Sequence, residues 1–245
     1  MKKYIYILSL ITFTSCSFIN PFHDEGENIE TIIELDVFTQ IEIKNVFNIE
    51  IVKDSENYII YKGGEQIFNE MKYVSQAGRL SLDYNFTNWT NNLEFPTLEI
   101  HLSLLESLDL KGSCNIKSIG QLHGDKLSIY VYDSADVYEI NFNISYNNLN
   151  YHSRGSGGKF AIRGTCPTAS YTLNGSANLN ATKLVSKNVT VIHNSLGDAH
   201  IYAEDKIAVT FYKSGDLYYS GNPNEIDIKY DQINNQDASG KVIKE

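Results

Sequence analysis

The sequence predicts an all-β protein, a single β-helix-like solenoid of ~20-residue repeats with short capping strands and one small helical turn. Three observations predict this fold class. Apolar and polar residues alternate along most of the chain beyond residue 35, as in half-buried strands. Six segments from residue 107 onward resemble one another, and no stretch has a long helical period. The 17 Tyr, with many Ile, Val and Thr, favour strands.

The N-terminal residues have the pattern of an export signal. Met1-Lys2-Lys3 is positively charged, residues 4–13 are an apolar run, and Cys16 follows two small residues. A membrane-spanning helix needs ~20 apolar residues, so this shorter run predicts a signal peptide. Phe13-Thr14-Ser15-Cys16 resembles a bacterial lipobox, which implies cleavage before Cys16 and its lipidation.

This interpretation divides the chain into three parts: residues 1–15 as signal peptide, 16–34 as lipidated N-terminus and tether, and 35–245 as solenoid. It predicts an exported protein that is lipid-anchored to the bacterial cell envelope, at the outer membrane. The membrane is then its first partner. The alternative is ordinary secretion with Cys16 as an incidental thiol.

The first elements of the solenoid show a period of two residues. Ile41 and Ile43 flank Glu42, and Ile49 and Ile51 flank Glu50. Residues 58–61 and 79–84 continue this strand pattern, and residues 65–73 have spacing that suits one short helical turn. Residues 85–92 are rich in Asn and Thr and predict a loop around Trp89.

The repeats follow from residue 107. Aligned segments start 18 to 22 residues apart, at Leu108, Ile129, Tyr151, Tyr171, Val191 and Val209. Their first and third positions are mostly apolar, which predicts inward side chains. Turn-forming residues then recur, and we interpret these as structural: Gly112, Ser113, Ser134, Gly155, Ser156, Gly175, Ser176, Gly197, Ser214 and Gly215. An Asn/Asp/Gly column comes next, at Asn115, Asp136, Gly158, Asn178, Asp198 and Asp216, and an apolar residue follows each member except where Lys159 stands.

A stack of such repeats closes a core that one repeat could not bury. Gly, Asn and Asp suit turns that need positive φ, and stacked Ser, Asn and Asp side chains can bond to the equivalent turn one rung away. A flat β-sandwich is the alternative architecture.

With the columns aligned, residues 36–245 resemble a known family, the putative auto-transporter adhesin head domains. The matching turns include Lys111-Gly112-Ser113, Arg154-Gly155-Ser156-Gly157 and Asn174-Gly175-Ser176-Ala177. The resemblance implies a β-helical fold and a role in adhesion or surface recognition, in cell-envelope proteins common in Bacteroidota. It names no ligand.

Composition and motifs argue against several function classes. The net charge of −10, which becomes −12 without Lys2 and Lys3, disfavours binding to nucleic acid. The six His show no zinc-protease spacing, and no phosphate-binding glycine motif or Gly-x-Ser-x-Gly occurs. We therefore expect no enzyme, no cofactor and no metal. The turn acids Asp136, Asp198 and Asp216 are expected to cap turns rather than to bind Ca²⁺.

Three inward or near-inward residues carry further expectations. His193 is predicted to be a hydrogen-bonded core histidine. Cys114 and Cys166 are predicted to stay reduced, because two rungs would separate them by ~10 Å and a disulfide needs Cα atoms within ~7 Å.

The outward columns suggest a contact surface. The candidate residues are Tyr130, Tyr132, His152, Arg154 and Tyr212, with Trp89 as a separate candidate. Aromatic and hydrogen-bonding groups of this kind suit a glycan or an envelope-protein ligand. The alternative is that Tyr and Thr merely suit exposed strands.

The sequence thus favours a non-enzymatic adhesion or ligand-recognition lipoprotein. A structural envelope protein that assembles with itself or with partners is the alternative, although short terminal strands and the charged residues 241–245 argue for capped ends. A polysaccharide-active enzyme on a β-helix is less favoured. The ligand, the oligomeric state and the periplasmic or surface orientation stay open.

Overall fold

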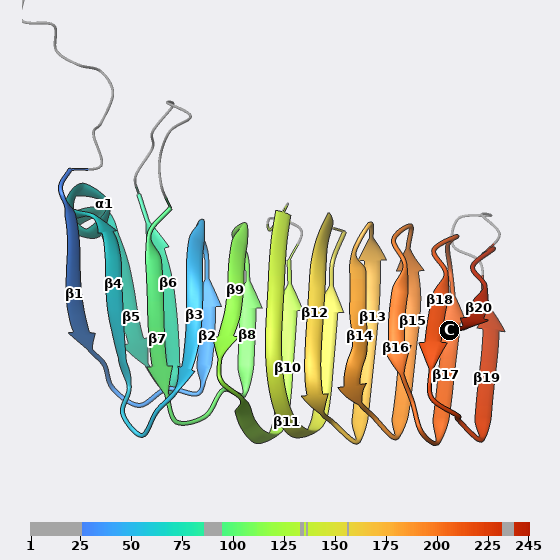
Figure 1. Cartoon of the computed structure of the whole chain (residues 1–245). Helices are drawn as coiled ribbons and strands as arrows, with labels where there is room; N and C mark the ends of the chain where they lie inside the picture. Colours follow the sequence, from blue (N-terminus) through green and yellow to red (C-terminus); the bar gives the residue numbers. More distant parts are fainter. Residues whose placement is uncertain (1–25, 86–94, 133–134, 136, 156, 232–237) are drawn as a thin grey trace, which may run out of the picture.

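The computed structural model describes residues 26–85, 95–132, 135, 137–155, 157–231 and 238–245. The protein is a β-solenoid of about six turns with one short helix, and 68% of it is strand (Figure 1). The predicted fold class is therefore confirmed. Most neighbouring strands pair in parallel, which separates this fold from a sandwich of antiparallel hairpins.

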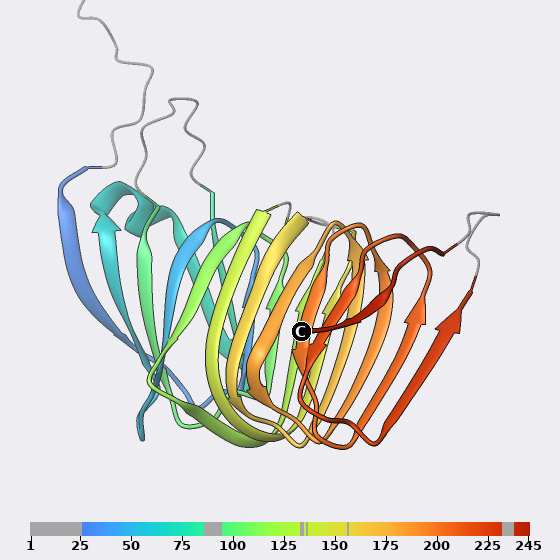
Figure 2. The ribbon, with the colours of Figure 1, turned by 45° about the vertical axis from the view of Figure 1, so that its right-hand side comes forward.

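The strands form two faces that enclose the core, and a curved side joins them (Figure 2). The first face contains, in spatial order, β1 (Asn28–Glu34), β4 (Tyr58–Gly64), β7 (Thr97–Leu102), β3 (Phe47–Lys53), β9 (Cys114–Ile119), β11 (Val137–Ser153), β12 (Gly157–Thr165), β14 (Asn178–Val185), β16 (Ala199–Tyr202), β18 (Leu217–Ser220) and β20 (Val242–Lys244).

The second face contains, in the same direction, β5 (Met71–Gln76), β6 (Arg79–Tyr84), β2 (Gln40–Ile43), β8 (Ser107–Leu110), β10 (Leu122–Val131), β11, β13 (Thr168–Gly175), β15 (Asn188–Ser195), β17 (Lys206–Phe211) and β19 (Glu225–Tyr230). Strand β11 belongs to both faces. Its first half pairs with β9 and β12, and its second half pairs with β10 and β13.

The aligned repeats of the sequence coincide with the rungs of the solenoid. Strand pairing places the first repeat positions in one register, namely Leu108, Ile129, Tyr151, Tyr171, Val191 and Val209. All six side chains are buried. Burying a large apolar side chain contributes roughly 1.5–3 kcal/mol, so this column is a main source of stability.

The Asn/Asp/Gly column requires a correction in the middle of the stack. Strand pairing places Glu139 and Lys159, and not Gly158, in register with Asn115 and Asn178. Asp136, the predicted member from the preceding repeat, lies outside the described residues. Because the turns differ in length, counting a fixed number of residues from the preceding strand gives the wrong residue in these two repeats. With Lys159 in the column, the next residue is the buried Phe160, and the apparent exception in the apolar pattern disappears.

The N-terminal rungs do not follow the order of the sequence. Strands β2 and β3 lie between the later strands β6 and β7 on one side and β8 and β9 on the other (Figure 1). The pairs β1–β4, β4–β7 and β5–β6 are antiparallel. The predicted helical turn is α1 (Glu65–Glu70), which buries Ile67 and ends where β5 begins.

The predicted tether contains a strand. Residues 28–34 form β1, which pairs along its whole length with β4. Cys16 lies outside the described residues. Within the described ranges, no helix has the length and apolarity needed to cross a membrane.

Turn glycines serve two different purposes. Gly155 and Gly175 have φ angles of 78° and 74°, a conformation that glycine adopts without steric cost. Gly175, Gly197 and Gly215 also lie against the preceding rung, where a Cβ atom would collide with the carbonyl oxygens of Gly155, Ala177 and Gly197 respectively. Successive rungs can therefore approach closely at this edge.

Both predicted free cysteines are present as buried thiols. Cys114 begins β9, whereas Cys166 follows the end of β12. Burial raises the pKa of Cys114 to about 12 and that of Cys166 to about 11, which keeps both as unreactive thiols.

Side-chain ladders connect successive rungs at the turns. Asn178 Oδ1 accepts the Asp198 N–H at 3.2 Å, and Asp198 Oδ1 accepts the Asp216 N–H at 2.9 Å. Asp216 Oδ1 accepts the Lys241 N–H at 2.8 Å. These bonds confirm the expected contact from one rung to the next, and they give Asp198 and Asp216 a structural role.

We expect Asp216→Ala to lower the free energy of unfolding by about 1 kcal/mol, because the Lys241 N–H loses its acceptor. Asp216→Asn retains an oxygen at the same place and is the matched control. Urea denaturation measures both variants. Equal losses in the two variants would show that the charge, and not the hydrogen bond, matters.

His193 is inward, as predicted, and its side chain is fully buried. Neither ring nitrogen has a well-formed hydrogen bond to a described residue, although the Asp216 backbone lies near enough to the ring to raise its pKa in part. The imidazole stacks on Phe211 with the ring centroids 5.4 Å apart. Burial lowers the pKa of His193, so the folded protein holds the neutral ring.

This burial predicts a pH effect on stability. As the pH falls from about 7.5 to about 5, the unfolded chain protonates this histidine near pH 6.5 while the folded chain resists protonation. The unchanged chain should therefore lose stability on acidification that His193→Leu does not lose. Urea denaturation at both pH values tests this, with the exposed His123→Gln as control. Parallel pH profiles for the unchanged chain and His193→Leu would contradict the prediction.

Candidate functional site

Four of the predicted contact residues gather on the second face. Tyr130 on β10 pairs with His152 on β11, and their ring centroids are 6.3 Å apart. Tyr130 is 40% exposed. The Tyr132 ring lies near the cations of Lys111 and Arg154, at 5.3 and 5.4 Å from its centroid. We call Tyr130, Tyr132, His152 and Arg154 the aromatic–basic patch.

Tyr212 does not belong to this patch. It lies beside Asn194, which pairs with Asn174. Tyr212 is therefore three strands beyond Arg154, or ~14 Å at ~4.8 Å per strand. Among the described residues, the predicted contact surface thus consists of the aromatic–basic patch and a distant tyrosine. The separate candidate Trp89 and the turn residues Ser134 and Ser156 lie outside the described residues.

A charge network lies beside the patch. Lys111 forms an ion pair with Glu42, and Arg79 lies 3.1 Å from Asp109. Burial raises the pKa of Glu42, but its hydrogen bonds, led by the one from Lys111, outweigh burial and lower the pKa to about 2. Burial also raises the pKa of Asp109, and Arg79 opposes that effect. The network holds Lys111 close to the Tyr132 ring. Its ammonium group is already paired with Glu42.

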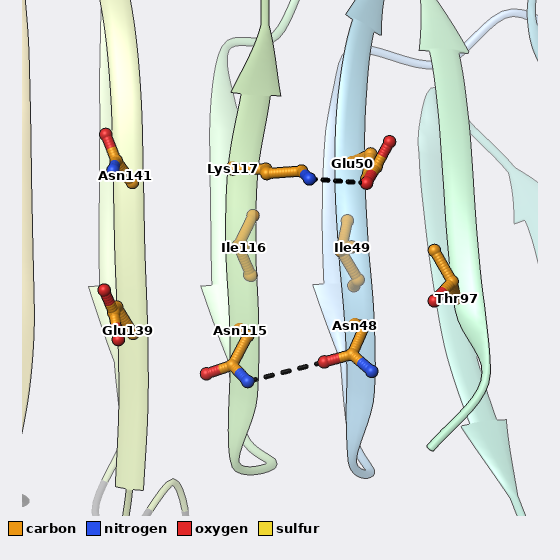
Figure 3. A pocket seen from close by; sticks show the side chains of 9 residues that line it. All are labelled: Asn48, Ile49, Glu50, Thr97, Asn115, Ile116, Lys117, Glu139 and Asn141. Carbon is orange, nitrogen blue, oxygen red and sulfur yellow. Dashed lines mark hydrogen bonds and ion pairs between the residues drawn. The ribbon is translucent and has the colours of Figure 1, made fainter. Parts of the chain in front are cut away.

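The first face carries a concave surface that the sequence did not reveal. A groove of about 400 Å³ crosses four adjacent strands, β7, β3, β9 and β11 (Figure 3). Its lining residues are Asn48, Ile49, Glu50, Thr97, Asn115, Ile116, Lys117, Glu139 and Asn141. We call it the amide groove.

The groove follows from the same alternation that builds the core. Ile49 and Ile116 point inward and are buried, so the residues on either side of them project outward. Strand pairing sets Asn48 beside Asn115, and Glu50 beside Lys117.

Two contacts tie these outward rows together. Lys117 Nζ lies 2.7 Å from a carboxylate oxygen of Glu50, and Asn115 Nδ2 donates to Asn48 Oδ1 at 3.4 Å (Figure 3). Glu139 and Asn141 add a third row on β11. The surface thus offers amide, carboxylate and ammonium groups at the strand spacing of ~4.8 Å.

A histidine near one end of the groove resembles part of a catalytic group. His101 on β7 has Nδ1 at 2.9 Å from Asp54 and Nε2 at 2.9 Å from Glu99. The hydrogen bond from His101 is the main cause that lowers the pKa of Asp54 to about 2. Because carboxylates engage both ring nitrogens, no nitrogen remains to take a proton from a substrate. The cluster is therefore suited to bracing the first face.

No metal-binding cluster is found within the described ranges. No group of three or more His, Cys, Asp or Glu side chains there is arranged to hold a metal ion. The turn acids Asp198 and Asp216 already accept backbone N–H groups.

Sequence and structure comparisons give the family and the fold of this chain. Residues 37–223 match the family model described as putative auto-transporter adhesin, head GIN domain. A crystal structure of a putative adhesin from Bacteroides fragilis NCTC 9343 has a TM-score of 0.79 at 19% identity, over 89% of this chain and 97% of that one. No protein with curated function is detectably similar in sequence.

Two further crystal structures have the same fold. A putative adhesin from Parabacteroides merdae ATCC 43184 has a TM-score of 0.65 at 15% identity, over 90% of this chain and 97% of that one. A protein from Parabacteroides distasonis ATCC 8503, described as a putative lipid binding protein, has a TM-score of 0.64 at 17% identity, over 90% and 97%. These likenesses show the fold alone.

Proposed function

We propose a function from one premise: the chain belongs to the putative auto-transporter adhesin, head GIN domain family. The family suggests a cell-surface or envelope protein of adhesin type. We propose that this chain is a non-enzymatic lipoprotein, anchored through Cys16 at the outer membrane. Its solenoid binds an extended glycan along the first face.

The amide groove is the observation that carries this proposal. Ligand sites usually combine a concavity of ~300–1,000 Å³ with a few converging polar groups, and the groove of about 400 Å³ falls within that range. Amide side chains both donate and accept hydrogen bonds, as sugar hydroxyls require. The rows also repeat along the stack, so a polymer with a regular repeat can contact several strands at once. Many tethered copies would then add avidity to a weak single contact.

We expect Asn115→Ala with Asn141→Ala to weaken glycan binding tenfold or more, since each lost hydrogen bond is worth about 1 kcal/mol. The probe is an array of bacterial polysaccharides and animal glycans, read with the full chain carrying Cys16→Ala. The matched control is Lys187→Ala with Asn188→Ala, exposed residues at the start of β15 on the other face. No binding to any glycan, or equal loss in both pairs, would reject the groove as the glycan site.

The aromatic–basic patch supports a second candidate, a protein ligand. Tyr and Arg dominate the energetically important residues of protein interfaces, and Tyr130 is 40% exposed beside His152 and Arg154. Tyr130→Ala with Arg154→Ala forms an additional arm of the same experiment, tested against envelope-protein extracts. Loss of protein capture with retained glycan binding would assign the patch to a protein partner.

Lipidation makes a separate prediction. Cys16→Ala should move the protein from the membrane fraction to the soluble fraction of the cell, because the acyl chains would be absent. Immunoblotting of the two fractions measures this, and Cys114→Ala is the control because its thiol is buried in the solenoid. An unchanged distribution in Cys16→Ala would contradict lipidation.

A further inference from the structure

The C-terminal end of the solenoid leaves core positions uncovered. Strand β19 is the last strand of the second face, and it pairs with β17 (Figure 2). No described strand pairs with its other edge. In β17, Ile207, Val209 and Phe211 are at most 2% exposed. Their partners in β19, in the same order, are Ile226, Ile228 and Tyr230, at 37%, 42% and 56% exposed.

Outward charges are the only protection of this edge against pairing within the described residues. Soluble proteins guard edge strands with charged side chains, proline, bulges or inward-pointing charges. The six residues of β19 contain no proline, and all three inward positions are apolar. The charged Asp227 and Lys229 point outward and lie 3.5 Å apart.

The free backbone groups of β19 can be assigned. The Asp231 N–H donates to the Phe211 carbonyl at 2.9 Å, and the Glu225 N–H donates to the Asp205 carbonyl. In a strand, the N–H and C=O of one residue point to one side and those of the next residue point to the other. The odd-numbered residues therefore bond to β17. The backbone groups of Ile226, Ile228 and Tyr230 point to the open edge.

We propose that β19 pairs antiparallel with β19 of a second copy of this chain, about a twofold axis at Ile228. Each Ile228 then faces the partner's Ile228, and Ile226 faces the partner's Tyr230. In such a pair, the N–H group of each residue donates to the C=O group of the residue opposite it, so each facing pair forms two hydrogen bonds. The two solenoids join end to end with one continuous apolar core.

Apolar side chains favour this register. With the axis at Ile228, all three inward residues of each copy face an inward residue of the partner. A shift of the axis to residue 227 would place Tyr230 opposite Asn224, and a shift to residue 229 would place Ile226 opposite Gln232.

The charged side chains contribute in both directions. Asp227 faces the partner's Lys229, and this favourable contact occurs twice. Glu225 faces the partner's Asp231 at the two ends of the pair, and these like charges weaken the dimer. The strand is thus self-complementary in apolar side chains, in backbone direction and in its central charges.

The proposed contact closes at two copies. A twofold interface uses the same surface of both partners and leaves no further β19 edge to extend the assembly. The opposite end of the molecule is built differently, from the antiparallel strands β1, β4 and β5 and the helix α1. The dimer would place the two β1 strands at opposite ends of a longer rod.

Charge reversal tests the dimer. The full chain carrying Cys16→Ala, which excludes association through lipid or through that thiol, should have the mass of a dimer by light scattering. Asp227→Lys should raise the dissociation constant tenfold or more, because it creates two like-charge contacts. The double variant Asp227→Lys/Lys229→Asp restores opposite charges and should restore the dimer. Glu204→Lys, an exposed charge reversal before β17, is the control.

A cross-link tests the register. The Cα atoms of a hydrogen-bonded antiparallel pair lie ~5.5 Å apart, within the range of a disulfide. Ile228→Cys should therefore give a covalent dimer on mild oxidation, whereas Asp227→Cys should not. Circular dichroism verifies that each variant is folded. A monomer at all concentrations, a dimer that Asp227→Lys leaves unchanged, or concentration-dependent species larger than a dimer would overturn the proposal.

Discussion

Parallel stacking of rungs is the constraint on which the rest of this protein depends. No single rung can bury its apolar residues, so each relies on the next rung for burial and for its backbone hydrogen bonds. The inward column from Leu108 to Val209 stays in register for this reason. The Asn and Asp ladders at the turns then reinforce a register that the core has already set.

The same constraint generates the surfaces. Because strands alternate, each buried Ile or Tyr fixes an outward neighbour, and stacking turns these neighbours into rows. On the first face the rows consist of amides and charges and form the amide groove. On the second face, cations close to Tyr132 and a charge network around Glu42 hold the aromatic–basic patch together. The alternation of inward and outward side chains along stacked strands thus produces two faces of different chemistry.

Two places in the solenoid depart from a fully buried apolar core: a buried imidazole and the exposed last strand of the second face. His193 occupies a mostly apolar column, where burial lowers the pKa of its ring. Strand β19 keeps the inward apolar alternation, yet no described strand covers its outer edge, so its inward residues are partly exposed. The dimer that we propose would cover them and would leave the two long faces free for ligand.

The sequence by itself determined the fold class, the register of the second-face strands from residue 108 onward and the short helix, because local alternation and repeated spacing are properties of the chain alone. The grouping of Tyr130, Tyr132, His152 and Arg154 also followed from aligned columns. Only the tertiary structure decided that residues 48–50 lie beside residues 115–117, and hence that a groove exists. The insertion of β2 and β3 between later strands is a long-range pairing, and no local pattern encodes it. The variable turn lengths that misplaced Gly158, and the exposure of β19, likewise depend on which strands are neighbours in space.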